Sequence, residues 1–152
     1  MRTEQSKGTS EIIIFSAFVN GANLPYDLGT VEKRVPPKPD ILCQHQTDGL
    51  VAFELVEICD AKLAQFNATV KEGGTYYIRT ADPSAQIIRK KLRRKYETTY
   101  PIELLCYTAG RVVTPANVII PTIRPYLRSV RHVFRRAWLL SQGKVYEVWN
   151  VS

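Results

Sequence analysis

The feature that most constrains the fold is a pair of short apolar segments joined by a polar connection. Residues 39–43 and 50–58 are largely apolar, and the connection between them ends in Asp48-Gly49. Apolar runs of this length on either side of an Asp-Gly turn predict a β-hairpin. Its first strand carries Asp40 at its start, and its second strand carries Glu54 within an apolar run.

Both acids lie where burial is expensive. A carboxylate surrounded by Phe, Leu and Val side chains loses its hydration, so it must be paired, protonated or bound to a cation. Two carboxylates brought together across a hairpin form a natural site for a hard divalent cation such as Mg²⁺. The hairpin therefore predicts a metal site at Asp40 and Glu54.

Pro39-Asp40, the hairpin connection and Glu54-Leu55-Val56 resemble the motif of the PD-(D/E)xK nuclease superfamily, which has the restriction-endonuclease-like fold. In that superfamily the Asp starts one strand, and a Glu and a Lys lie two residues apart on the next. The resemblance covers about residues 30–110. It implies that Asp40, Glu54 and the backbone carbonyl of Leu55 hold Mg²⁺ or Mn²⁺, which activates a water molecule against a phosphodiester.

The lysine of the motif is missing, because its position is occupied by Val56. Either another lysine supplies the positive charge of the missing motif lysine, with Lys71, Lys90 and Lys91 as candidates, or the site is catalytically inactive and only binds its partner. The chain is then a Mg²⁺-dependent nuclease or a non-catalytic module that binds nucleic acid or an acidic protein. A plain structural subunit is the third alternative, since a Pro-Asp and a strand Glu at this spacing also occur by chance.

Three further polar residues are assigned as auxiliary site residues. Side chains alternate between the faces of a strand, so Glu57 and Glu54 point to opposite faces, and Glu57 is expected to help only near the strand end. The resemblance suggests Glu32 as a substitute for the N-terminal glutamate often found in this superfamily. It also suggests Gln86, on the next predicted helix, as a residue near the site.

Positive charge is concentrated on a helix predicted over residues 83–96. The chain carries 21 Lys and Arg against 14 Asp and Glu, a net charge of +7, which suits a polyanionic partner. Like charges four residues apart destabilise a helix by about 0.2–0.5 kcal/mol per pair, which favours a neutralising anion such as a phosphate backbone. The residues assigned to nucleic-acid binding on this helix are Arg89, Lys90, Lys91, Arg93 and Arg94.

A last helix is predicted from about Pro121 to Arg136. Its arginines recur at three- and four-residue spacing and would form one ridge, comprising Arg124, Arg128, Arg131 and Arg135. Arginine suits bidentate contacts with phosphate, so Arg128 and Arg131 are also assigned to nucleic acid. The solvated outer face of an ordinary amphipathic helix explains both basic segments equally simply.

The chain of 152 residues suits one α/β or α+β domain, with a mixed sheet of about five or six strands flanked by helices. Residues 1–10 are predicted to be flexible, and residues 11–152 to form a single restriction-endonuclease-like domain. The run Ile12–Phe15 fits a strand or a buried helix. The remaining predicted elements are a helix over 61–70, strands over 75–79 and 100–108, and a hairpin over 138–151.

The cellular setting is predicted from what the sequence lacks. Cys43, Cys59 and Cys106 lie in apolar contexts without close pairing, which predicts buried free thiols. There is no apolar run of eighteen residues and no signal peptide, so the expectation is a cytoplasmic protein that does not contact membranes. Nuclease relatives of this kind often act as dimers, which leaves a homodimer open.

Overall fold

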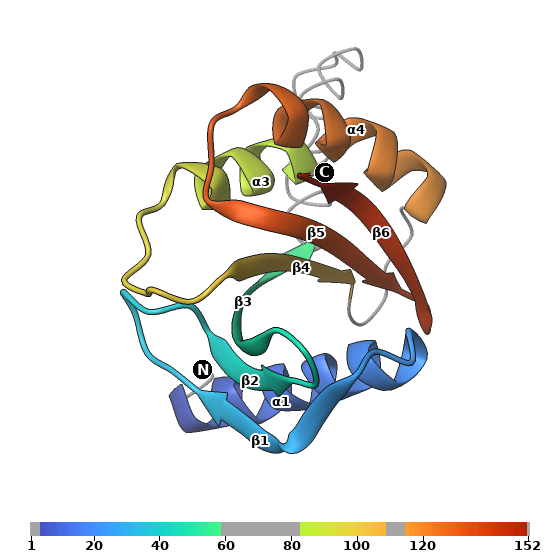
Figure 1. The fold of residues 1–152 in the computed structure, drawn as a ribbon. Coiled ribbons are helices and arrows are strands. Elements are labelled where there is room, and N and C mark those ends of the chain that lie inside the picture. Colours follow the sequence, from blue (N-terminus) through green and yellow to red (C-terminus); the bar gives the residue numbers. More distant parts are fainter. Residues whose placement is uncertain (1–3, 59–82, 109–114, 152) are drawn as a thin grey trace, which may run out of the picture.

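The computed structural model describes residues 4–58, 83–108 and 115–151, and it is an α+β structure built around a six-stranded mixed sheet (Figure 1). Along the chain the elements are α1 (Glu4–Gly21), β1 (Tyr26–Lys33), β2 (Ile41–His45), β3 (Gly49–Ile58), α3 (Pro83–Arg93), β4 (Ile102–Thr108), α4 (Ala116–Ser129), β5 (Phe134–Ser141) and β6 (Lys144–Asn150). The prediction of a mixed sheet flanked by helices is confirmed. The predicted helix over 61–70, the strand over 75–79, Cys59 and Lys71 lie outside the described residues.

The strands lie in sequence order across the sheet, from β1 at one edge to β6 at the other. The pairs β1–β2, β2–β3 and β5–β6 are antiparallel, whereas β3–β4 and β4–β5 are parallel. Parallel neighbours need a long crossover, and the segments that contain α3 and α4 provide the two crossovers. Consequently α3 and α4 lie on one face of the sheet and α1 on the other (Figure 1).

Each face of the sheet has its own apolar core. On one face, Ile88 of α3 and Ile123 of α4 pack against the side chains of Val56, Leu104 and others. On the other face, the aromatic rings of Phe15, Phe18 and Phe53 pack against one another, and Phe18 also packs against Trp138. The central strands β3 and β4 are therefore buried on both sides, which explains why their sequences are almost continuously apolar.

The predicted hairpin is confirmed as β2 and β3, with Ile41 opposite Phe53 and His45 opposite Gly49. Gly49 has a φ of 77°, a conformation that glycine adopts without steric cost. The predicted terminal hairpin is also confirmed as β5 and β6. It turns at Gln142 and Gly143, which both have positive φ values, as a tight hairpin turn requires.

The N-terminal segment is a helix, so the run Ile12–Phe15 is not a strand. Phe15, Phe18 and Val19 share one stripe of α1 and are buried against the sheet, which favours the helix. The helix begins at Glu4, so part of the segment that was predicted to be flexible is helical.

The last helix ends earlier than its arginine spacing predicted. Helix α4 ends at Ser129, and residues from Phe134 onward form β5, so the prediction of a helix to Arg136 is wrong. The two neighbouring strands explain the difference, because β5 pairs with both β4 and β6 along its length. Tertiary pairing of this kind overrides a local helical spacing.

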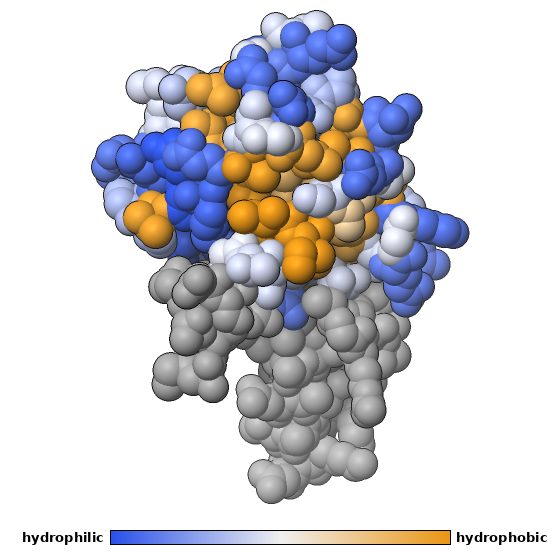
Figure 2. Space-filling model, turned by 90° about the horizontal axis from the view of Figure 1, so that it is seen from below, coloured by the Kyte–Doolittle hydropathy of each residue, from blue (hydrophilic) through white to orange (hydrophobic). Residues whose placement is uncertain are grey.

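Seen from the side of α1 and β1, apolar side chains gather in the middle of the surface, with polar side chains around them (Figure 2). Ile13 of α1 is 63 % exposed.

In the part of the chain that the structure describes, no helix combines the length and hydrophobicity needed to cross a membrane.

Candidate functional site

The β2–β3 hairpin brings Asp40 and Glu54 together. Asp40 directly precedes β2, and its backbone N–H donates a hydrogen bond of 3.2 Å to Oε1 of Glu54. In return, the backbone N–H of Leu55 donates to Oδ2 of Asp40 at 2.9 Å. Both acids are buried, with exposed fractions of 7 % and 2 %. The two predicted metal ligands are therefore neighbours at one end of the hairpin.

The surroundings of Glu54 oppose its ionisation. Glu54 points to the face of the sheet that α3 and α4 cover, together with Ala52 and Val56. Burial raises the pKa of Glu54 above its ordinary value, and the neighbouring Asp40 carboxylate raises it further, whereas Lys91 lowers it. Such a carboxylate gains from a nearby cation, because the cation favours its charged form.

A basic side chain of helix α3 supplies the positive charge beside Glu54. The ammonium group of Lys91 lies 2.8 Å from Oε2 of Glu54, and the guanidinium of Arg94 lies 3.5 Å from the same oxygen. Lys91 flanks the buried stripe of Ile88 and Leu92, by which α3 packs against the sheet. Lys71 lies outside the described residues; of the other two candidates for the motif lysine, Lys91 lies against the acids and Lys90 is exposed.

A second acid–lysine pair reaches Asp40 from the opposite face. Lys33, the last residue of β1, lies 2.8 Å from Oε1 of Glu11 and 3.4 Å from Oδ1 of Asp40. Burial alone would lower the pKa of Lys33, but the two carboxylates raise it above its ordinary value. Glu11 is 3 % exposed, and it connects α1 to the site through Lys33.

Glu11 was not identified from the sequence, although a signal was present. It lies four residues before Phe15 and seven before Phe18, so on a helix all three fall on one stripe. An acid on the buried stripe of an apolar helix requires a partner. The burial of Glu11 could not be predicted, because the run beginning at Ile12 fits a strand as well as a helix.

The three auxiliary residues do not join the acids. Glu57 points to the opposite face of the sheet from Glu54, as the strand period predicted. Glu32 is 59 % exposed in its side chain and pairs with Arg34 at 3.4 Å. Gln86 is exposed and lies five residues before Lys91, so the two side chains leave α3 about 140° apart.

The donor atoms at the hairpin suit a hard cation. Mg²⁺ commonly binds through one or two carboxylates and completes its coordination with water and substrate oxygens. Asp40 and Glu54 provide two carboxylates whose orientation is set by backbone N–H groups. Within the described ranges, no group of three or more His, Cys, Asp or Glu side chains is placed to hold a metal ion, so the pair would depend on a carbonyl and water for the remaining ligands.

Only some of the basic residues predicted to bind nucleic acid are exposed. On and just after α3, Arg89, Lys90, Arg93 and Arg94 are exposed, while Lys91 points inward. Arg128 and Arg131 are exposed at and after the end of α4, which packs against α3. The remaining arginines of the expected ridge have structural partners, because Arg124 donates to the carbonyl of Val148 and Arg135 lies on β5. The predicted ridge on one helix is therefore wrong.

Cys43 and Cys106 are buried and free, as predicted. Burial raises the pKa of the Cys106 thiol to about 12 and also raises that of the Cys43 thiol. Neither thiol is suited to act as a nucleophile, since the thiolate is the reactive form.

No family model matches the chain, and no curated protein and no solved structure matches it either.

Proposed function

We propose that the protein is a divergent PD-(D/E)xK-like nuclease, which binds nucleic acid and hydrolyses phosphodiesters with Mg²⁺ or Mn²⁺. The proposal is carried by one observation, the convergence of Asp40, Glu54 and Lys91. Two carboxylates and a lysine are the residue types of the motif, and Lys91 lies 2.8 Å from Glu54 although it comes from α3. It would replace the lysine that is absent at Val56.

The arrangement of elements supports this proposal. Helix α1 is followed by three antiparallel strands, then by α3 on the opposite face and by β4, which runs parallel to β3. The resemblance implies an N-terminal element, the hairpin with the acids, a helix, a strand and then a basic helix. The N-terminal element, the hairpin and the basic helix follow in that order, while the helix and strand expected between the hairpin and α3 fall within residues 59–82, outside the described residues.

Each residue of the site has a defined role in the proposed reaction. Asp40 and Glu54 would hold the metal ion, which when bound lowers the pKa of a water molecule and polarises the phosphate. The N–H groups of Leu55 and Asp40 orient the two carboxylates, as outer partners of metal ligands commonly do. Lys91 would stabilise the negative charge that develops on the phosphate, and the exposed side of α3 would bind the backbone on either side.

A cleavage assay tests the proposal directly. Supercoiled plasmid and end-labelled single- and double-stranded oligonucleotides are incubated with Mg²⁺, with Mn²⁺ or with EDTA. We expect cleaved products only where a metal ion is present. Absence of cleavage with every substrate and both metals, together with no heat of metal binding, would contradict the proposal.

The alternative is a catalytically inactive module of the same fold that binds nucleic acid or an acidic protein. One observation favours it, because Lys33, Lys91 and Arg94 lie against Glu11, Asp40 and Glu54 and balance their charge. A dication would have to displace part of this balance. Calorimetric titration with Mn²⁺ separates the two functions, since nucleic-acid binding without any Mn²⁺ binding supports the module.

Lys91→Met is expected to move the pH dependence of the site upward. Lys91 lowers the pKa of Glu54, so its removal lets burial and Asp40 raise that pKa further. Because metal ligation requires the ionised carboxylate, Mn²⁺ affinity increases with pH and levels off above this pKa. The Mn²⁺ affinity of the variant should therefore level off at a higher pH than that of the wild-type protein. At pH values where the affinity no longer changes, kcat should be about 10²–10³-fold lower in the variant.

Mn²⁺ calorimetry over a series of pH values measures the shift. Lys90→Met is the matched control, because Lys90 is an exposed neighbour on the same helix. An unchanged pH profile in Lys91→Met would show that Lys91 does not act on Glu54.

The exposed basic residues of α3 are expected to determine the salt dependence of nucleic-acid binding. Each lost phosphate contact should reduce the slope of log K against log salt concentration by about 0.9 on duplex DNA and 0.7 on single strands. Arg89→Ala, Lys90→Ala and Arg93→Ala test this by fluorescence anisotropy at several salt concentrations. Lys144→Ala on β6 is the control with equal charge loss, and Arg128→Ala and Arg131→Ala test the second predicted segment in the same way.

A further inference from the structure

A cavity of about 510 Å³ lies beside the two acids. Pro39 and Ile41, which flank Asp40 in the sequence, form part of its wall. Ala52 also lines it, and because Ala52 and Glu54 share one face of β3 two residues apart, the cavity lies about 7 Å along the strand from Glu54. Arg34, Lys38, Tyr96, Glu97 and Tyr100 also line the cavity.

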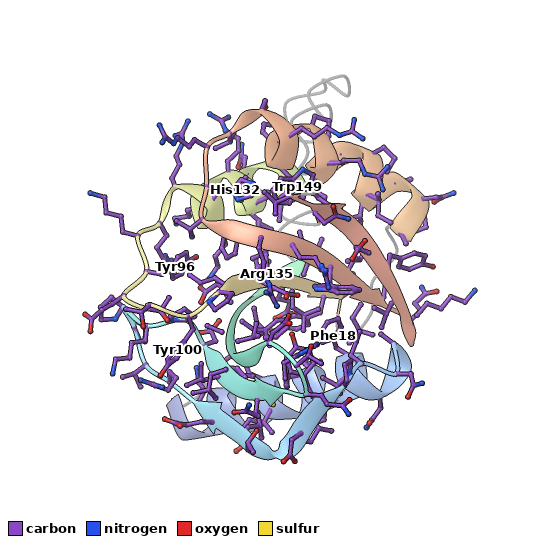
Figure 3. The ribbon with its side chains drawn as sticks, viewed as in Figure 1. Phe18, Tyr96, Tyr100, His132, Arg135 and Trp149 are labelled. Atoms are coloured by element: carbon purple, nitrogen blue, oxygen red, sulfur yellow. The ribbon has the colours of Figure 1, made fainter. Side chains whose placement is uncertain are left out.

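Two connections of the chain frame the cavity. One joins β1 to β2, and the other joins α3 to β4; the backbone N–H of Glu97 donates to the carbonyl of Pro37 at 2.9 Å and ties the two together. Figure 3 shows Tyr96 and Tyr100 on the second connection, at the same side of the molecule. The hydroxyl of Tyr96 donates to the carbonyl of Lys91, so the cavity wall is anchored to the lysine of the site.

The lining combines buried apolar side chains, two tyrosines and charged side chains. Leu42 and Ala52 are buried and apolar on the face that α3 covers, Tyr96 is half-buried, and Tyr100 is 41 % exposed, whereas the side chain of Ile41 packs in the core on the α1 face. Among the described residues, Arg34 forms one ion pair, with the exposed carboxylate of Glu32, and Lys38 forms none. Pockets of 300–1,000 Å³ with an apolar lining and few polar groups commonly bind small ligands. Two tyrosines, together with two cations against the single carboxylate of Glu97, favour a flat ring that carries a phosphate.

We propose that this cavity binds the base of an unpaired nucleotide, next to the phosphodiester that Asp40 and Glu54 would cleave. The inference rests on the proposed nuclease function and specifies its substrate class. A base within a duplex is stacked and paired, and it reaches a pocket only after it is extruded at a cost of a few kcal/mol. A single strand, a frayed end or a bulge offers the base without that cost, and stacking on tyrosine tolerates any base.

The charges of the cavity agree with this substrate. Lys38 and Arg34 line the cavity and belong to the connection that leads to Asp40, and the backbone N–H of Arg34 donates to the carbonyl of Asp40 at 2.8 Å. In the proposed complex the sugar–phosphate of the bound nucleotide runs along this connection towards the acids. The short separation along β3 places the phosphate of the same nucleotide at Asp40 and Glu54. The exposed residues of α3 then contact the neighbouring phosphates.

The test measures the binding of fluorescein-labelled oligonucleotides by anisotropy, in EDTA so that no cleavage occurs. The probes are a short oligothymidylate, the matching oligouridylate, an abasic version of the first, and a blunt duplex. Base stacking on an aromatic side chain contributes about 1–3 kcal/mol, so Tyr100→Ala should weaken binding of the single strands about 5–150-fold. Tyr100→Phe keeps the ring and should bind as tightly as the wild-type protein.

Further controls separate binding in the cavity from non-specific attraction of the oligonucleotide to positive charge. Lys38→Ala should weaken single-strand binding more than Lys144→Ala, which removes an equal charge from the first residue of β6. The abasic oligonucleotide should bind the wild-type protein and Tyr100→Ala equally weakly. Comparison of oligothymidylate with oligouridylate shows whether the cavity accepts DNA, RNA or both.

The possible failures are distinguishable. If the α3 variants lose binding but Tyr100→Ala binds the single strands like the wild-type protein, the cavity inference is wrong and the nuclease proposal stands. A wild-type preference for the blunt duplex over the single strands would also overturn the cavity inference alone. If the wild-type protein neither binds nor cleaves any probe, both proposals fail.

Discussion

Asp40→Asn is expected to abolish metal-dependent cleavage while nucleic-acid binding is retained. The substitution keeps the size of the side chain and an oxygen that accepts the Leu55 N–H bond, but it removes one of two anionic metal ligands. Loss of an outer partner of a metal ligand typically costs 10–100-fold in affinity or activity, so loss of the ligand itself should cost more than about 100-fold. Binding should persist, because the exposed residues of α3 supply the phosphate contacts.

Cleavage rates and anisotropy on the same oligonucleotide measure the two properties. Glu57→Gln is the matched control, since Glu57 lies on the same strand as Glu54 but points to the opposite face. We expect this control to cleave like the wild-type protein. Cleavage that persists in Asp40→Asn at the wild-type rate would refute the assignment of the site.

Glu103→Ala is expected to cause the largest loss of stability. Glu103 is 1 % exposed in β4, and it accepts hydrogen bonds from Trp138 Nε1 at 2.7 Å and from Arg135 Nε at 2.8 Å. Arg135, labelled in Figure 3, continues the network to Asp48 in the β2–β3 turn. Both hydrogen bonds end on the charged carboxylate of Glu103, and the loss of each typically costs about 1.5–3 kcal/mol; Arg135 keeps Asp48 as a partner, whereas the buried Nε1 of Trp138 loses its acceptor.

Urea denaturation measures the free energy of unfolding, and thermal unfolding should show a fall in Tm of about 6–20 °C for a chain of this length. Glu147→Ala is the control, because its pairing with Arg136 is exposed and should contribute no more than about 1 kcal/mol. Glu103→Gln should lose less than Glu103→Ala, since it keeps an acceptor for Trp138. A stability of Glu103→Ala within 1 kcal/mol of the wild-type protein would contradict the argument.

Local patterns predicted the parts of the fold that depend on neighbouring residues. The β2–β3 hairpin follows from two apolar runs around Asp48-Gly49, and the β5–β6 hairpin from Gln142-Gly143. The same local pattern predicted that Asp40 and Glu54 meet, because a hairpin fixes which residues lie opposite each other. Strand alternation also separated Glu54 from Glu57 correctly.

Local patterns failed where two interpretations fitted the same residues. The arginines from Arg124 to Arg135 have helical spacing, yet the chain leaves the helix at Ser129. Phe134–Ser141 lies between β4 and β6, and the hydrogen bonds and burial available there outweigh a spacing of surface charges. Spacing alone carries no information about which neighbouring strands are available.

The amino-acid sequence alone therefore established a mixed α+β sheet, two hairpins and two facing acids. The charges around those acids depended on the packing of the helices. Lys91 comes 37 residues after Glu54 in the sequence and reaches it only because α3 packs across β3, and Glu11 reaches Lys33 only because α1 covers the opposite face. Contacts across such separations follow from how whole elements pack together, which a local sequence pattern does not encode.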